Sequence, residues 1–254
     1  MIATRTDFPF RVRVVESLPI RLPCGTLLSA RAWLPETDTP VSAVLVYLPY
    51  RKRDGTRARD QGLHGYLAGH GYAAIRLDIR GMGDSAGILH DEYTRTEQQD
   101  GCDAITWIAN QDWCGGRVAM IGISWSGFNG LQIAALGPPA LKTVITLGST
   151  DDRYATDVHY IGGCFSKDNI DWPATMMAQN DLPPDPAIVG AKWRGMWLQR
   201  IHANEPWSHI WMAHQRRDAY WQQGSICQDS AASRFPFTPS PAGPTIIPRR
   251  FPAC

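Results

Sequence analysis

The chain has 254 residues, of which 44% are hydrophobic and 19% charged, and a chain of this length can bury most of its surface around one or two cores. This composition excludes collagen-like, coiled-coil and fully disordered proteins. The 25 basic and 24 acidic side chains form no long run of either sign. We therefore do not expect nucleic acid or an anionic membrane as a partner. The expected partner is a small neutral substrate.

The sequence predicts neither a membrane-spanning segment nor a signal peptide. Its longest apolar run, at residues 118–123, is far shorter than the roughly 20 residues that a membrane helix needs, and residues 1–17 lack the apolar core of a signal peptide. We therefore expect a cytoplasmic protein. The six cysteines show neither CxxC nor Cys/His ligand spacing, which favours buried free thiols over a disulfide framework or a metal site.

The first 150 residues predict alternating strands and helices. Residues 11–34 alternate between apolar and polar side chains around a turn at 23–25, which is typical of a β-hairpin or meander. Short apolar runs predict further strands at 43–48, 72–78, 117–123 and 142–147. Helical spacing predicts helices at 63–69, 96–110 and 128–135. This order indicates a doubly wound α/β domain with a mostly parallel sheet over residues 1–150.

The character of the chain changes after residue 150. Six tryptophans appear among methionines and prolines in residues 151–229, which predicts short helices that form a cap over a site at the edge of the sheet. Alternatively, these tryptophans are ordinary packing between helices. Residues 230–254 are rich in proline and serine and lack periodicity, so their composition predicts a disordered tail.

The strongest functional motif is GISWSG at residues 122–127, between a predicted buried strand and a helix. A nucleophile elbow needs this context, because its serine occupies a tight turn with small neighbours and the next N–H points at the oxyanion. Gly122 and Ser126 are the small neighbours of Ser124. The usual pattern has glycine where Ser126 stands, and serine is still small enough for the turn. We interpret Ser124 as a candidate nucleophile.

Two further segments follow predicted strands. Tyr50 stands after the strand at 43–48, where an α/β hydrolase takes its second oxyanion donor, although a tyrosine there is otherwise commonly a packing residue with a solvated hydroxyl. Residues 78–87, DIRGMGDSAG, contain a weak GxG. A nucleotide-binding interpretation fails because the full GxGxxG run is absent. We expect a structural turn beside the site.

Together these segments resemble the cocaine-esterase and glutaryl-acylase group of α/β hydrolases, which is related to the X-Pro dipeptidyl-peptidases. The resemblance runs from about residue 15 to Asp229 and rests on LPYRK at 48–52, DIRGMGDSAG, GISWSG, and DDRY, HY and GG between 151 and 163. It implies that Ser124 is the acyl nucleophile and that the Tyr50 hydroxyl and the Trp125 backbone N–H form the oxyanion hole. It also implies an α/β-hydrolase core with a helical cap, a small ester, amide or short-peptide substrate, and no metal or organic cofactor.

The acid and the histidine of the family's catalytic triad have no counterpart in this sequence. The order in α/β hydrolases is serine, acid, histidine, and the family has its aspartate after the cap, in a GWxD segment, with the histidine later. Asp151, Asp152 and Asp157 match cap-opening residues instead, and four histidines lie within the predicted cap, where we expect structural roles: His159, His202, His209 and His214. The hydrolase core is therefore expected to be incomplete at its C-terminal end. Without a general base, the Ser124 hydroxyl is a poor nucleophile.

Back-translation suggests a frameshift as another cause of this tail. If one base is restored after the codon of Asp229, codons compatible with the observed residues can encode YSRIKIPVYAVAGWADNYT in the shifted frame. This segment contains the GWxD pattern and places the missing aspartate at the position of Thr245. We therefore expect a single-base deletion, natural or from sequencing, at or just after Asp229. The sequence predicts a serine hydrolase of the acyl-transfer type that is impaired in this form. The alternative is a non-catalytic remnant or small-molecule binder. The oligomeric state stays open.

Overall fold

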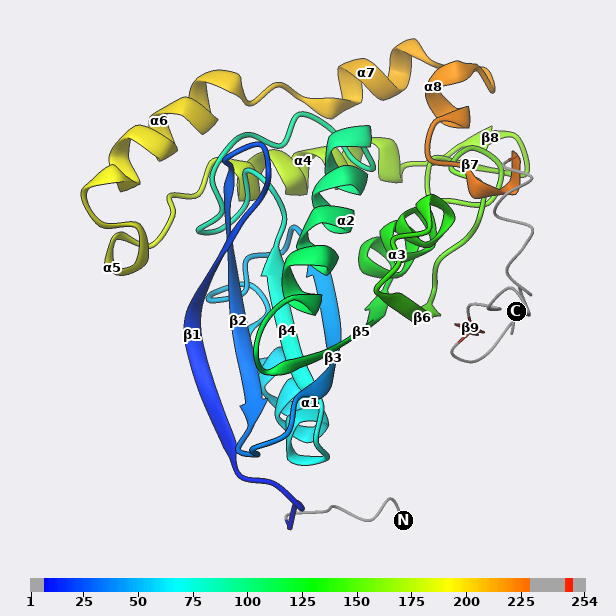
Figure 1. The fold of residues 1–254 in the computed structure, drawn as a ribbon. Coiled ribbons are helices and arrows are strands. Elements are labelled where there is room, and N and C mark those ends of the chain that lie inside the picture. Colours follow the sequence, from blue (N-terminus) through cyan, green and yellow to red (C-terminus); the bar gives the residue numbers. More distant parts are fainter. Residues whose placement is uncertain (1–6, 229–244, 249–254) are drawn as a thin grey trace.

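The computed structural model describes residues 7–228 and 245–248. Their centre is a sheet with the strand order β1-β2-β4-β3-β5-β6-β9 (Figure 1). Strands β3 to β6 pair in parallel, whereas β1, β2 and β9 pair antiparallel with their neighbours. The strands are β1 (Val12–Arg21), β2 (Leu27–Pro35), β3 (Val41–Leu48), β4 (Ala73–Asp78), β5 (Cys114–Ile123), β6 (Leu141–Leu147) and β9 (Thr245–Pro248).

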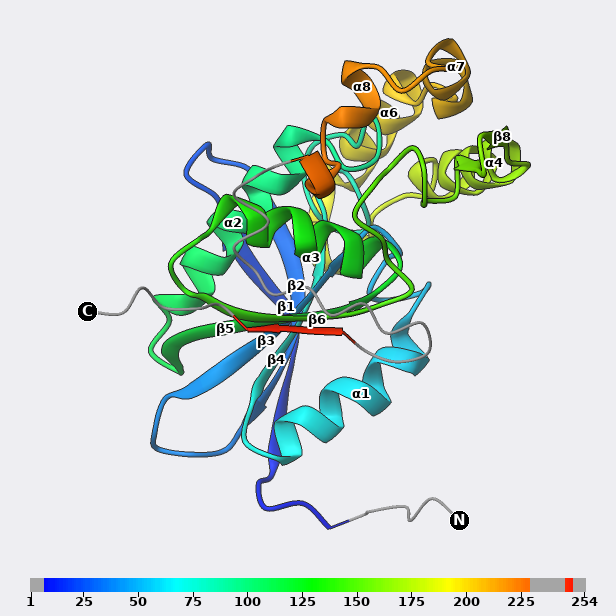
Figure 2. The same ribbon diagram turned by 90° about the vertical axis from the view of Figure 1, so that its right-hand side faces the viewer.

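Three helices connect the parallel strands and cover both faces of the sheet. Helix α1 (Arg57–Gly69) lies on one face, and α2 (Arg95–Ala109) and α3 (Trp125–Leu136) lie on the other (Figure 2). The sheet needs this double cover because every residue of β4, and β3 from Ala43 onward, is buried. The predicted doubly wound α/β fold is confirmed.

The predicted starts of three elements are wrong by three residues or more: those of α1 and β5, and that of α3, which begins at Trp125 rather than at residue 128. Helix α1 begins earlier than predicted, at Arg57, because its first turns carry charged side chains and so lack apolar periodicity. One of them, Asp60, is buried and pairs with the buried Arg76 of β4, with 3.0 Å between Oδ2 and Nε. Strand β5 begins at Cys114 rather than Arg117, because the strand continues through an irregularity in its pairing with β3.

Within the described residues, five further α-helices lie between β6 and β9 in the sequence, and they lie together beyond one end of the sheet (Figure 1). They are α4 (Asp168–Asn180), α5 (Pro186–Val189), α6 (Trp193–Ala203), α7 (Trp207–Ala213) and α8 (Ala219–Gln222), with a small hairpin of β7 (Tyr160–Ile161) and β8 (Cys164–Phe165) before them. Trp207, Trp211 and Trp221 are buried in the same hydrophobic cluster as the core of the sheet. These three tryptophans are therefore packing residues. The domain limits at 150 and 229 stay predictions.

Within the predicted tail, the structure describes only β9, which pairs with β6 from Thr143↔Pro248 to Thr146↔Thr245. The rest of the tail and the proposed deletion after Asp229 lie outside the described residues. Among the described cysteines none forms a disulfide, and Cys24, Cys164 and Cys227 are exposed, so the expectation of buried thiols is wrong for these three. Within residues 7–228 and 245–248, no helix has both the length and the apolarity required to cross a bilayer.

Candidate active site

Ser124 occupies a sharp turn between β5 and α3. Its φ of 55° and ψ of −119° lie in a region that non-glycine residues rarely adopt, and such strain persists only where the surrounding structure enforces it. The neighbours leave no room for larger residues. A Cβ on Gly122 would lie 2.3 Å from the backbone carbon of Ser126, and one on Gly127 would lie 2.3 Å from Oγ1 of Thr146. The local geometry is that of a nucleophile elbow.

Serine fits where the common motif has a second glycine. The Ser126 side chain is buried, and its Oγ accepts a hydrogen bond of 3.3 Å from the backbone N–H of Tyr47. This bond joins the turn to β3. Helix α3 starts at Trp125, so the Trp125 N–H is among the first N–H groups of the helix and has no acceptor within the helix. It is available to a ligand of the site.

Tyr50 lies beside the elbow. Strands β3 and β5 are parallel with Leu45 opposite Met120, so the residues after both strands meet at one edge of the sheet. The Tyr50 ring lies edge-on to the Trp125 ring, with 6.2 Å between the centroids. Burial, together with the nearby charges of Glu92 and Glu97, raises the pKa of Tyr50. The phenol therefore keeps its proton at neutral pH and can donate a hydrogen bond.

A buried carboxylate below the elbow was not predicted from the sequence. Oε1 of Glu97 accepts hydrogen bonds from Nε1 of Trp125, at 2.7 Å, and from Nδ2 of Asn129, at 2.9 Å. Oε2 accepts one of 2.9 Å from the backbone N–H of Tyr93, which has a positive φ of 51°. Burial raises the pKa of Glu97 to about 7. The periodicity of α2 contains no signal for this role, because two of the three partners of Glu97, Trp125 and Asn129, come from α3.

The helices beyond the sheet pack aromatic rings against Trp125. Trp172 of α4 and Trp207 of α7 lie near Trp125, with centroid distances of 6.0 and 6.1 Å. Nε1 of Trp172 is buried and has no hydrogen-bond partner in the described structure. Aromatic rings thus pack around the Trp125 indole, and the Trp172 indole N–H is a buried donor without a partner among the residues that the structure describes.

The segment DIRGMGDSAG forms a tight turn at the end of β4. Gly83 has a positive φ of 52°, and a Cβ there would lie 2.1 Å from Oδ2 of Asp78. The buried Lys52 holds this turn, because its Nζ lies 2.6 Å from Oδ2 of Asp84 and 3.4 Å from Oδ2 of Asp78. The segment therefore has the structural role expected of it. The role of Lys52 was not predicted.

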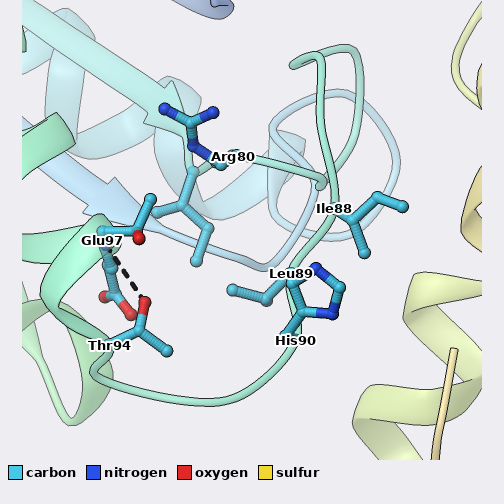
Figure 3. A pocket seen from close by; sticks show the side chains of 8 residues that line it. Arg80, Ile88, Leu89, His90, Thr94 and Glu97 are labelled. Atoms are coloured by element: carbon cyan, nitrogen blue, oxygen red, sulfur yellow. Dashed lines mark hydrogen bonds between the residues drawn. The ribbon is translucent and has the colours of Figure 1, made fainter. Parts of the chain in front are cut away.

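A cavity of about 350 Å³ lies on the α2 side of this turn. Figure 3 shows Arg80, Thr94 and Glu97 across the cavity from the loop that carries Leu89 and His90. Arg80 is already engaged, since its Nε and Nη2 donate to the Asp100 carboxylate at 2.6 and 2.7 Å. The cavity therefore offers mainly apolar contacts.

Several of the histidines and aspartates after the elbow contact residues other than Ser124. His159 pairs with Glu92, and His214 pairs with Asp218 at 2.6 Å. Asp152 pairs with Arg217 and accepts hydrogen bonds from two backbone N–H groups. In the part of the chain that the structure describes, no histidine is hydrogen-bonded to the Ser124 hydroxyl. The expectation of structural roles for these histidines and aspartates stays a prediction.

A parallel sheet, an elbow after a central strand and helices beyond the sheet define the α/β-hydrolase fold. The chain belongs to the X-Pro dipeptidyl-peptidase (S15) family, whose model matches residues 25–238, which confirms the resemblance seen in the sequence. It is 30% identical over 156 residues to a cocaine esterase of Rhodococcus sp., a match that covers 60% of this chain and 26% of the relative. It is 36% identical over 93 residues to a putative serine esterase of Mycobacterium bovis, covering 37% of this chain and 15% of the relative.

Solved structures show the same fold. A CocE/NonD family hydrolase from Staphylococcus aureus superposes with a TM-score of 0.66 at 19% identity, covering 85% of this chain and 38% of that protein. The chain therefore matches well under half the length of these relatives.

Proposed function

We propose that Ser124 is the nucleophile of a serine hydrolase that cleaves a small ester, amide or short X-Pro peptide by acyl transfer. The observation that carries this proposal is the strained backbone of Ser124 between β5 and α3, with φ at 55°. Membership of the S15 family and the likeness to a cocaine esterase support the reaction class and the kinds of substrate.

In the proposed reaction, Ser124 Oγ attacks the carbonyl carbon, and the oxyanion accepts hydrogen bonds from the Trp125 N–H and the Tyr50 hydroxyl. Tyr50 can act in this way because it stays protonated. Collapse of the tetrahedral intermediate breaks the ester or amide bond, and the leaving alcohol or amine takes up the proton lost by Ser124. Water then hydrolyses the acyl-Ser124 ester and releases the acid. The base that removes the Ser124 proton is not among the contacts in the described residues. We therefore expect full activity only where an aspartate–histidine pair is supplied.

A second candidate function is non-catalytic binding of a small apolar molecule. It is favoured by one observation, the lack of any histidine hydrogen-bonded to Ser124 in residues 7–228 and 245–248.

A fluorophosphonate probe separates the two functions because it labels only activated serines. The proposal predicts labelling of the wild-type chain that is lost in Ser124→Ala and kept in the matched control Ser208→Ala. Tyr50→Phe keeps the ring against Trp125 and removes the hydroxyl, so labelling should slow by roughly 10²–10³-fold, as when an oxyanion donor is lost. No labelling of a folded wild-type chain would support the binder.

A further inference from the structure

We propose that Glu92, Asp157 and His159 form a binding site for one divalent transition-metal ion, separate from the Ser124 hydroxyl. The three side chains each offer a ligand atom, and these atoms all lie within 4.8 Å of one another. Glu92 comes from the loop between β4 and α2, and the other two come from the segment between β6 and β7. Two carboxylates and one imidazole are a donor set typical of first-row divalent ions.

Among the described residues, only one of the two carboxylate oxygens of Glu92 has hydrogen-bond partners. Its Oε1 lies 3.1 Å from Nη2 of Arg153 and 2.7 Å from Nε2 of His159, whereas Oε2 is buried without a partner. The residue is 1% exposed, so water does not readily satisfy this oxygen. An unpaired buried carboxylate oxygen is costly. Glu92 therefore brings one buried acceptor without a partner to the cluster.

Asp157 supplies a second oxygen of the same kind. Its Oδ2 is also buried without a partner. Asp157 is partly exposed whereas Glu92 and His159 are closed off, so an ion would enter from the Asp157 side.

Nδ1 of His159 is held as a hydrogen-bond donor, which leaves Nε2 as the nitrogen that could bind a metal. The amide nitrogen of Asn169 donates to the carbonyls of His159 and Ser166, at 2.7 and 3.1 Å, so its Oδ1 must be the acceptor for Nδ1–H of His159, 2.9 Å away. Nε2 then faces Glu92 and can become a ligand once its proton leaves to solvent. A second hydrogen bond that orients the imidazole in this way is usual at metal sites.

The local charges suit a dication. Asp91 adds a third buried carboxylate, whose oxygens accept from Trp211 Nε1 at 3.0 Å and from the Tyr220 hydroxyl at 2.6 Å. With His159 neutral as a ligand, three carboxylates stand against the single guanidinium of Arg153. One divalent ion balances that charge. A primary ammonium would also pair with the two free oxygens, but it would not use the imidazole nitrogen.

Mn²⁺ binding to the whole chain, freed of metal with a chelator, tests the site, because Mn²⁺ prefers oxygen and imidazole ligands to the exposed thiols. Electron paramagnetic resonance should show one saturable Mn²⁺ per chain, and Mn²⁺ should raise the melting temperature. Asp157→Asn should weaken binding at least tenfold. Asp171→Asn, which removes an exposed carboxylate, should leave binding unchanged.

Asp157→Asn also controls for folding. Because the lost oxygen has no partner, the metal-free variant should melt at or above the wild-type temperature. The proposal is overturned if the folded wild type binds no stoichiometric Mn²⁺, or if Asp157→Asn binds it equally well. It is also overturned if methylammonium, and not Mn²⁺, stabilises the protein in a way that depends on Asp157. None of these outcomes depends on hydrolase activity, so the proposed function is tested separately.

Discussion

The carboxylate of Glu97 accepts a hydrogen bond of 2.7 Å from the indole Nε1 of Trp125, the residue that follows the candidate nucleophile. Through this bond α2 holds the first residue of α3, and with it the backbone N–H assigned to the oxyanion hole. The same carboxylate also holds the N–H of Tyr93, whose ring stacks on Phe128 with 4.6 Å between centroids. The elbow therefore depends on a buried acid that is far from it in the sequence.

Glu97 should make stability fall as pH rises. Burial raises its pKa from 4.5 to about 7 in the folded state, so between these values the folded chain holds a proton that the unfolded chain has lost. This contribution is complete below pH 4.5 and disappears as pH rises to about 7. The free energy of unfolding, measured with urea, should be lower at pH 8 than at pH 5, and Glu97→Gln should remove up to about 3 kcal/mol of this difference. The exposed Glu36→Gln is the control, and equal pH dependence in both variants would contradict the assignment.

Gly122→Ala should destabilise the chain and distort the elbow. A Cβ at this position meets the backbone of Ser126 at 2.3 Å, which a side-chain rotation cannot relieve, so we expect a loss of roughly 1–3 kcal/mol in the free energy of unfolding. Gly62→Ala in α1 is the matched control, because a Cβ there meets nothing within 4 Å. That substitution should stabilise the chain by about 0.5–1 kcal/mol. Denaturant unfolding measures both, and a harmless Gly122→Ala would show that the turn is not as tight as described.

Lys52→Met should be strongly destabilising. The Lys52 ammonium is buried between Asp84 and Asp78, and its removal leaves buried carboxylates short of positive charge, which costs roughly 3–5 kcal/mol. Lys167→Met breaks an exposed ion pair with Asp171 and should change the melting temperature little. Thermal melts of the two variants compare a buried with an exposed lysine. Similar small shifts would mean that Asp78 and Asp84 find other partners.

Cys24 should react with iodoacetamide much faster than Cys227 near pH 7.5, although both are exposed. Hydrogen bonds with Thr26 and Arg80 lower the pKa of Cys24 to about 7. Burial of its sulfur and the nearby Asp152 raise the pKa of Cys227 to about 11. The thiolate is the reactive form. Peptide mass spectrometry after brief alkylation measures both sites at once, and equal rates would rule out the proposed effect of Thr26 and Arg80.

Local signals in the sequence are enough to predict the order of strands and helices in the first 150 residues and the turn that carries Ser124, whereas β7, β8 and β9 were not predicted. Apolar runs such as residues 43–48 predict buried strands, and a serine between small residues after such a strand predicts an elbow. The S15 family match agrees with that interpretation. The first turns of α1 consist mostly of charged and polar residues and show no apolar periodicity, so the sequence did not predict where this helix begins.

Only the tertiary structure decided which polar side chains meet. Glu97 and Trp125 lie 28 residues apart, and Glu92 and His159 lie 67 apart. No periodicity within one element encodes such a pair, since its geometry depends on how the loops and helices pack at the end of the sheet. His159 thus appeared as one histidine among four in a helical segment, and the fold placed it beside Glu92, Asp157 and Arg153. Burial in a medium of low polarity then made these contacts strong enough to shift pKa values and to favour binding of a cation.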